Sequence, residues 1–170
     1  MINIKLAKDE DFDFFYSLKC EESNILWTGN GDRPLRENIK IFFDSCIKNM
    51  SVPQERKIFI IYNDSIKVGH LYVIPNGEFV DIPVAISEAY RGCGFAEKAI
   101  LCGLEYCREK GFHKMIGHIR EDNIASIKTY EKCGSYLTGN YIYKKVSTVK
   151  NGEVVVKKVK MNEIAIDLQG

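Results

Sequence analysis

Apolar and polar positions alternate at the start of the chain and then recur at helical spacing. The stretch INIKLA alternates strictly, which predicts a short first strand. A helix is expected next over residues 9–20, with Asp9 as its N-cap. Residues 22–34 are interrupted by glycine and proline and are expected to form a loop. The apolar spacing of residues 35–50 predicts a second amphipathic helix.

The second half of the chain predicts a sheet whose strands are connected by two further helices. Two apolar runs around residues 63–65 predict a hairpin, and EFVDIPVAI predicts one further strand. A helix with apolar spacing over residues 96–107, the strand HKMIGHIR, the short helix NIASIKTYEKCG and a hairpin turned at residues 151–152 follow. The strand–helix–strand unit of residues 79–119 should form a right-handed parallel crossover in a largely antiparallel sheet.

Composition indicates one domain over residues 1–170. Of the 170 residues, 45% are apolar and 11% aromatic, which suffices for a sizeable core, and no linker or repeat marks a boundary. The formal net charge of +1 gives no general reason to expect nucleic acid as a partner. No stretch approaches the roughly 18 apolar residues of a membrane span, so we expect a cytoplasmic monomer or homodimer without membrane contact.

The six cysteines are expected to be reduced thiols. They lie without the CxxC spacing of redox or metal motifs, in a chain long enough to build a core without disulfides. Cys102 and Cys107, with His113 and His118, contain no short chelating pair. We therefore expect no metal.

The stretch YRGCGFAEKAI places a glycine-rich turn at the start of a predicted helix. Helix N-termini expose unpaired backbone N–H groups, Arg91 adds a permanent cation, and Gly92 and Gly94 let the main chain approach a bulky anion. The sequence after Gly94 is FAEK, which excludes the P-loop, and Glu97 occupies the third small position of the dinucleotide fingerprint. The turn predicts a phosphate site of another class.

Two short motifs carry a family resemblance. The first is R-x-x-G-x-A at a strand–helix junction, formed by Arg91-Gly92-Cys93-Gly94-Phe95-Ala96. The second is N-x-x-S-x-x-x-Y-x-x-x-G, formed by Asn123, Ser126, Tyr130 and Gly134. Together they resemble the GNAT superfamily of acyl-coenzyme A-dependent N-acetyltransferases. The second motif is similar to that of the RimJ/RimL-like branch, which includes ribosomal-protein and spermidine acetyltransferases. The resemblance covers about residues 59–166.

The resemblance implies a fold and a co-substrate. The expected fold is α/β of the α+β type, GNAT-like, with a mixed, mostly antiparallel sheet of about seven strands and about four flanking helices. Strands 4 and 5 should form the parallel pair. The co-substrate is acetyl-coenzyme A, whose pyrophosphate the amides of residues 91–96 would bind. The implied reaction is direct acetyl transfer to an amine acceptor.

Site roles follow from the same resemblance. The exposed backbone of the fourth strand, at Val84, Ala85 and Ile86, would contact the acetyl and pantetheine portions. Asn123 would hold the pantetheine arm, Ser126 would assist, and Tyr130 would donate a proton to the departing sulfur. By its composition alone, the helix that carries Tyr130 favours a core aromatic at that position.

The general base and the role of Cys93 are less constrained by the motifs. Asp81 is the carboxylate that we place in the site, because burial on a strand raises the pKa of a carboxyl group. Glu78, His70, His118 and proton transfer through water remain open alternatives. Cys93 is expected to be a bystander in the phosphate loop, since a thiolate there would compete with the pyrophosphate.

The acceptor is expected to meet the segment of residues 20–38. Glu22 and Trp27 are our substrate-binding candidates, with Glu21 and Asp32 adding negative charge that favours a cationic amine. A solvated loop with Trp27 packed on the core is an equal alternative. A protein N-terminus, a polyamine and an amino sugar all fit. Competing functions are a non-catalytic coenzyme A sensor, and an RNA- or protein-binding module on the lysine-rich last hairpin.

Overall fold

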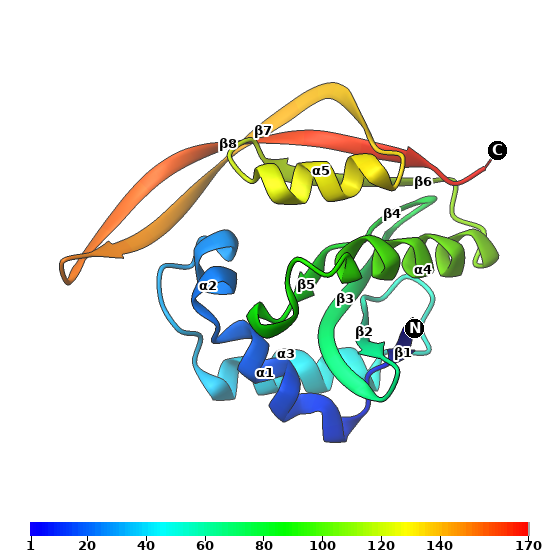
Figure 1. Cartoon of the computed structure of the whole chain (residues 1–170), viewed down its shortest axis with the longest axis horizontal. Coiled ribbons are helices and arrows are strands. Elements are labelled where there is room, and N and C mark those ends of the chain that lie inside the picture. The colour runs from blue at the N-terminus through cyan, green and yellow to red at the C-terminus, as the bar shows by residue number, and fades with distance from the viewer. Residues whose placement is uncertain (170) are drawn as a thin grey trace.

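Eight strands, five α-helices and two 3-10 helices make up the computed structural model, which describes residues 1–169 (Figure 1). In chain order they are β1 (Ile2–Leu6), η1 (Asp9–Asp11), α1 (Phe12–Lys19), α2 (Glu22–Thr28), α3 (Arg36–Lys48), β2 (Lys57–Asn63), β3 (Ile66–Asn76), β4 (Phe79–Asp81), β5 (Val84–Ile86), η2 (Glu88–Tyr90), α4 (Phe95–Glu109), β6 (Lys114–Arg120), α5 (Ile124–Lys132), β7 (Tyr136–Lys150) and β8 (Glu153–Asp167). The predicted mixed α/β fold is confirmed, with one strand and one helix more than expected.

The strands form one sheet with the order β1-β2-β3-β4-β6-β8-β7, and β5 pairs with β3 beside this path. The pair β4 and β6 is parallel, with Phe79 opposite Lys114 and Val80 opposite Met115, and the remaining pairs are antiparallel. Helix α4 lies between these two strands in the chain and forms the expected crossover. The fourth and fifth predicted strands are therefore the parallel pair, as expected.

The segment of residues 79–86 forms two strands, where the sequence pattern predicts one. β4 ends at Asp81, and Pro83 has no N–H group to continue a ladder. β5 then pairs with β3 alone, with Gly69 opposite Ile86. The sheet consequently parts between β5 and β6. We call this the strand split.

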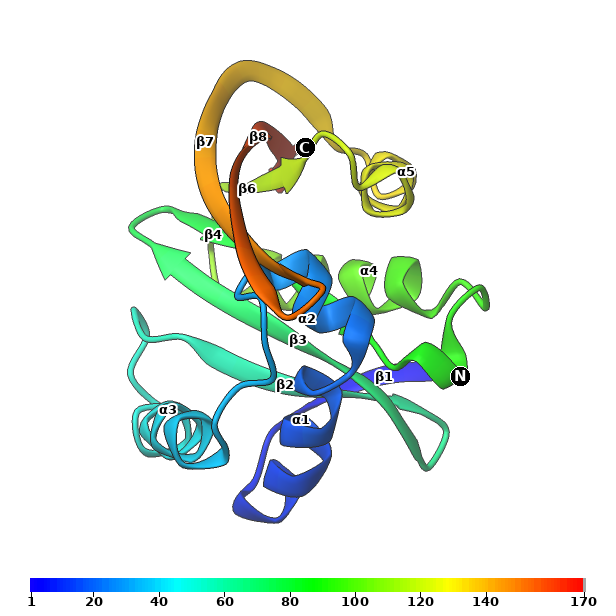
Figure 2. The same cartoon turned by 90° about the vertical axis from the view of Figure 1, so that its left-hand side faces the viewer.

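Two hydrophobic clusters lie on opposite faces of the sheet. β2 shows why, because Phe59 and Ile61 pack in the cluster under α4 while Ile58 and Ile60 pack in the cluster of α1 and α3. All four are almost fully buried. Figure 2 shows α4 and α5 on one side of the strands and α1 with α3 on the other.

Helix α2 corrects the prediction of a loop over residues 22–34. At its N-terminus, Glu88 accepts hydrogen bonds from the Ser23 amide and hydroxyl at 3.0 and 2.6 Å. Glu21 in turn accepts hydrogen bonds from the Glu88 amide and the Ser87 hydroxyl at 2.9 and 2.7 Å. At its C-terminus, Gly29 adopts a left-handed φ of 74°, and its carbonyl accepts a hydrogen bond from the Ser147 amide at 2.8 Å. Distant residues thus stabilise a seven-residue helix that local periodicity does not predict.

The start of the first helical segment also differs from the prediction. Asp9 lies within η1, whose N-cap is Lys8, and the Asp11 carboxylate accepts a hydrogen bond from the Lys8 amide at 2.8 Å. Asp11 is buried and forms an ion pair with Lys67 at 2.7 Å. The Asp11 carboxylate, rather than that of Asp9, therefore holds this segment against β3.

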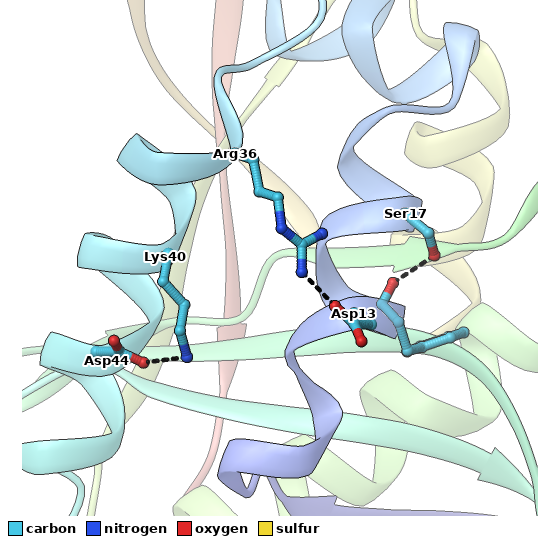
Figure 3. Close-up of polar contacts among 6 residues, drawn as sticks. Asp13, Ser17, Arg36, Lys40 and Asp44 are labelled. Carbon is cyan, nitrogen blue, oxygen red and sulfur yellow. Dashed lines mark hydrogen bonds and ion pairs between the residues drawn. The ribbon is translucent and has the colours of Figure 1, made fainter.

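Helices α1 and α3 are joined by charged side chains on their outer surfaces (Figure 3). Arg36 of α3 forms an ion pair with Asp13 of α1, and Lys40 pairs with Asp44 one turn further along α3 at 2.8 Å. Arg36 and Lys40 also lie over aromatic rings of the cluster beneath, including Phe12. Arg36 and Lys40 thus each combine an aromatic ring beneath the cation with a carboxylate partner.

The last two strands form a long hairpin that extends beyond the rest of the sheet (Figure 1). Its turn lies at Asn151 and Gly152, both with positive φ, as the sequence predicts. Val146 is buried against Gly29. None of the helices in residues 1–169 combines the length and apolarity that a bilayer span requires.

The close contact between β3 and β5 predicts that Gly69→Ala destabilises the protein. A Cβ at position 69 would overlap the Ala85 carbonyl oxygen, so β5 would have to move. We expect the free energy of unfolding to fall by about 1–3 kcal/mol in denaturant titrations. Ile66→Ala, at a half-exposed position of the same strand, is the control and should change it less. Equal stability of Gly69→Ala and the wild type would contradict this account of how β5 is placed.

Candidate active site

A cleft in two parts opens at the strand split. The larger part has a volume of about 460 Å³ and lies along β5, the start of α4 and α5. The smaller part, of about 150 Å³, lies between Asp81, α2 and β6. The residues common to both parts are Trp27, Val84, Asn123, Ser126 and Tyr130. The two parts therefore meet at the point where β5 leaves β6.

The structure brings most of the predicted cofactor-binding residues to the larger part. They come from β5, from the turn before α4 and from α5, and they are Val84, Ala85, Ile86, Arg91, Gly92, Gly94, Phe95, Ala96, Asn123 and Ser126. Cys93 lies in the same turn but is exposed and does not line the cleft. Its sulfur lies 3.7 Å from the Arg91 carbonyl oxygen. The position of Cys93 outside the lining agrees with the role of a bystander.

The turn before α4 is built to present backbone N–H groups. Gly92 and Gly94 both have φ of 76°, a conformation that glycine adopts without strain. Within residues 1–169, the amides of Gly92, Cys93 and Gly94 donate no hydrogen bond to the protein. Arg91 is held by a hydrogen bond from its Nε to the Ile86 carbonyl at 3.1 Å. Unpaired amides at a helix start beside a guanidinium are suited to bind a phosphate oxygen.

Asn123 precedes α5 rather than lying within it. Its side-chain oxygen accepts a hydrogen bond from the Ser126 amide at 3.3 Å, which makes Asn123 the N-cap of the helix. Of the three residues expected on one helix face, Ser126 and Tyr130 lie within α5 and Asn123 caps it. All three still line both parts of the cleft.

Tyr130 lies at the junction of the two parts. Its side chain is 6% exposed, and its hydroxyl donates a hydrogen bond to the Ile82 carbonyl at 2.6 Å. Burial raises the pKa of Tyr130 above its usual range, and the nearby Asp81 carboxylate acts in the same direction. The phenol is therefore neutral and available as a proton donor. The sequence offered two interpretations of Tyr130, a core aromatic and a residue of the site. In the structure Tyr130 is buried in the core and also lines the cleft.

Asp81 lines the smaller part of the cleft. Burial raises its pKa to about 6, although its Oδ1 accepts a hydrogen bond from the Ile82 amide at 2.8 Å and Arg56 opposes the shift. Gly117 on β6 allows this arrangement, because a Cβ there would lie 2.7 Å from Asp81 Oδ1. Sequence reasoning missed Gly117, although a glycine in the middle of a strand signals such a close approach.

The other base candidates are placed differently. His70 is buried against Phe15 and Tyr72, with ring centroids 5.0 and 4.9 Å away, and burial lowers its pKa to about 3. Neither His70 nor Glu78, which is exposed, lines the cleft. His118 does line the smaller part, with its Nε2 3.6 Å from a Glu163 carboxylate oxygen. Asp81 and His118 are thus the candidates that the structure places at the cleft.

The two acceptor candidates, Glu22 and Trp27, differ in whether they line the cleft. Trp27 lines both parts, whereas Glu22 is exposed and lines neither. Arg120, which sequence reasoning missed, lies 5.1 Å from the Trp27 ring centroid. It is 6% exposed and paired with Asp122 at 2.9 Å. Within residues 1–169, no group of three or more histidine, cysteine or acidic side chains could hold a metal ion.

Comparisons with known proteins point to one family. A model of the acetyltransferase (GNAT) family matches residues 10–135. A mycothiol acetyltransferase of Corynebacterium glutamicum is 33% identical over 59 residues, which cover 35% of this chain and 20% of that protein. The solved spermidine N-acetyltransferase of Vibrio cholerae, in complex with CoA and spermine, has a TM-score of 0.79 at 17% identity, over 98% of this chain and 95% of that one. A ribosomal-protein-alanine N-acetyltransferase from Brucella melitensis gives 0.76 at 16% identity, over 97% and 99%. These structures share the fold described above.

The buried carboxyl group of Asp81 predicts a pH-dependent stability difference. Because its pKa is raised to about 6, the folded protein holds this proton more tightly than the unfolded chain, and stability from Asp81 is lost as the pH rises from about 4 to about 6. Asp81→Asn removes the titration. Relative to the wild type, this variant should therefore gain about 2–3 kcal/mol between pH 4 and pH 7.5 in denaturant unfolding. Glu78→Gln is the exposed carboxylate control, and an equal pH dependence of all three proteins would refute the burial effect.

Proposed function

The chain belongs to the acetyltransferase (GNAT) family, and we propose that it transfers an acetyl group from acetyl-coenzyme A to a primary amine by direct transfer in a ternary complex. The observation that carries this proposal is the position of Tyr130 in the same cleft as the amide-rich turn before α4. The turn would hold one end of the co-substrate, and Tyr130 and Asp81 lie where the second part of the cleft begins. The series from Asn123 to Gly134 supports the RimJ/RimL-like branch.

The larger part of the cleft fits coenzyme A through its own polar groups. The unpaired amides around Gly92 and Gly94, together with Arg91, would bind the pyrophosphate. Within residues 1–169, the β5 edge that faces away from β3 has no strand partner, so its backbone groups would hydrogen-bond the amides of the pantetheine arm. The Asn123 side chain lines the cleft opposite that edge. The bound co-substrate supplies the reactive thioester.

Two side chains would move the protons of the reaction. Asp81, with a pKa of about 6, is largely ionised at neutral pH and would accept a proton from the attacking amine. Tyr130 is neutral and would give its hydroxyl proton to the departing sulfur after the hydroxyl turns away from Ile82. A coenzyme A sensor without activity would share the amide-rich turn, and the Tyr130 experiment below separates the two functions.

Arg91→Met tests the phosphate site. Loss of one charge-assisted contact should weaken coenzyme A binding about tenfold or more in isothermal titration, with little change in thermal stability. The matched control is Lys98→Met, which removes a cation from the first turns of α4 without touching the cleft lining. Equal affinities for wild type and Arg91→Met would place the pyrophosphate elsewhere.

Tyr130→Phe tests the proton donor. We expect kcat to fall by about 10²-fold or more with coenzyme A affinity preserved, because only the hydroxyl is removed. The kcat measurement follows thiol release with an amine acceptor, and titration gives the affinity. Stability must be measured alongside, since the hydrogen bond to Ile82 is lost too. Unchanged turnover at every pH would remove Tyr130 from the acid role.

A further inference from the structure

Two basic side chains lie over one aromatic ring on the sheet face that α1 and α3 cover. Lys19 Nζ, at the end of α1, lies 5.4 Å from the ring centroid of Tyr72, and the Arg56 guanidinium carbon lies 5.3 Å from the same centroid. Lys19 also lies over Phe15 at 5.0 Å, and Arg56 over Phe42 at 5.2 Å. Lys19, Arg56 and Tyr72 are half-buried. We call Lys19 and Arg56 the cation pair.

The cation pair has no carboxylate partner. Within residues 1–169, neither side chain makes an ion pair or a hydrogen bond. The neighbouring cations Arg36 and Lys40 also lie over aromatic rings, but each is paired with an aspartate (Figure 3). Burial and the charge of Arg56 lower the pKa of Lys19 to about 8. Two half-buried like charges without a counterion repel each other, and an anion bound between them would offset that repulsion.

The cation pair lies on the sheet face that Asp81 shares, although neither cation lines the cleft itself. Side chains alternate along β3, so Tyr72 shares a sheet face with Ile74, whose partner across the ladder is Asp81. Diagonal positions of this kind lie about 7–8 Å apart. The Tyr72 amide donates a hydrogen bond to the carbonyl of Pro83, which lines the smaller part, at 2.9 Å. The charge of Arg56 also reaches Asp81, whose pKa it lowers.

The carboxylates that would favour a cationic acceptor do not face this region. Glu21 is occupied by the Ser87 hydroxyl and the Glu88 amide, and Glu22 is exposed outside the cleft. On the sheet face that Asp81 shares, Lys19 and Arg56 add two positive charges that no ion pair within residues 1–169 neutralises. Such a surface suits an acceptor that brings its own negative charge.

We infer that Lys19 and Arg56 bind the carboxylate of an acceptor that carries both a primary amine and a carboxylate, an amino acid or a close derivative. This inference rests on the proposed acetyl transfer. The guanidinium and the ammonium hold the carboxylate, which directs the amine toward Asp81. The amine nitrogen forms a bond to the acetyl carbon, and the carbon–sulfur bond of the thioester breaks. The amine proton passes to Asp81, and Tyr130 protonates the departing sulfur.

Matched pairs of ligands test the inference directly. The full-length protein, saturated with coenzyme A, is titrated calorimetrically with each of the twenty amino acids and with its α-carboxamide, and with spermidine. At least one amino acid should bind about tenfold or more tightly than its amide, because the amide keeps the amine and removes the negative charge. In thiol-release assays with acetyl-coenzyme A, the same acid should show the lower KM.

Variants separate charge recognition from structure. Arg56→Met and Lys19→Met should each weaken binding of the acid about tenfold and leave the amide unchanged. Arg36→Met is the matched control, since it removes a cation from an aromatic ring on the same side of the sheet but outside the cation pair. Arg56→Gln and Lys19→Gln repeat the measurement should a methionine variant unfold.

Three results would overturn the inference. They are equal affinity of every acid and its amide, equal loss of both ligands in the variants, and tighter binding of spermidine than of any amino acid. Each of these can occur while coenzyme A binds and acetyl transfer proceeds, so the proposed function would stand. Absence of coenzyme A binding would instead overturn the proposed function and this inference together.

Discussion

The strand split is the constraint on which the rest of the site depends. β4 bridges β3 and β6, but its continuation beyond Pro83 stays with β3 alone. The gap that results exposes a backbone edge on β5, and it lets Tyr130 reach from α5 to the Ile82 carbonyl. Asp81 is the last residue before the gap, which explains how a half-buried carboxylate can line a cleft. A continuous strand over residues 79–86 would close the cleft.

Charge is distributed unequally between the two parts of the cleft. The larger part meets its ligand with backbone N–H groups and one arginine, which suits phosphate oxygens. The smaller part holds the Asp81 carboxyl group and the neutral phenol of Tyr130, and the cation pair lies on the sheet face that Asp81 shares. Burial is the leading cause of the shifts at Asp81, Tyr130 and Lys19. The exclusion of water that shifts these pKa values also strengthens the electrostatic interaction between the site and any charge on a ligand.

Local patterns predicted most of the fold, and distant contacts account for the remainder. Alternation, helical spacing and turn residues were enough for the order of elements, the parallel crossover and the turn before α4. Helix α2 was missed because its stability comes from Glu88 and Ser147, which lie far along the chain. The cation pair could not be predicted either, because Lys19 and Arg56 lie on separate elements and meet only over Tyr72. The acidic residues of the segment 20–38 suggested a cationic acceptor, yet the Glu21 carboxylate accepts hydrogen bonds from the Ser87 hydroxyl and the Glu88 amide instead. The roles of Glu22 and Trp27 stay predictions.

Helix α2 links the two halves of the sheet a second time. In its first turn, the Ser23 amide donates a hydrogen bond to Glu88, in the segment after β5. Directly after its last residue, the Gly29 carbonyl accepts a hydrogen bond from the Ser147 amide of β7. The parallel pairing of β4 and β6, by contrast, spans only two residue pairs. The two halves of the sheet are thus connected by the short β4–β6 pairing and, on the side where the strands part, by α2. Trp27 lines both parts of the cleft and Asn24 lines the larger one. Variation within α2 therefore changes the walls of both parts, while the turn before α4 keeps its own residues.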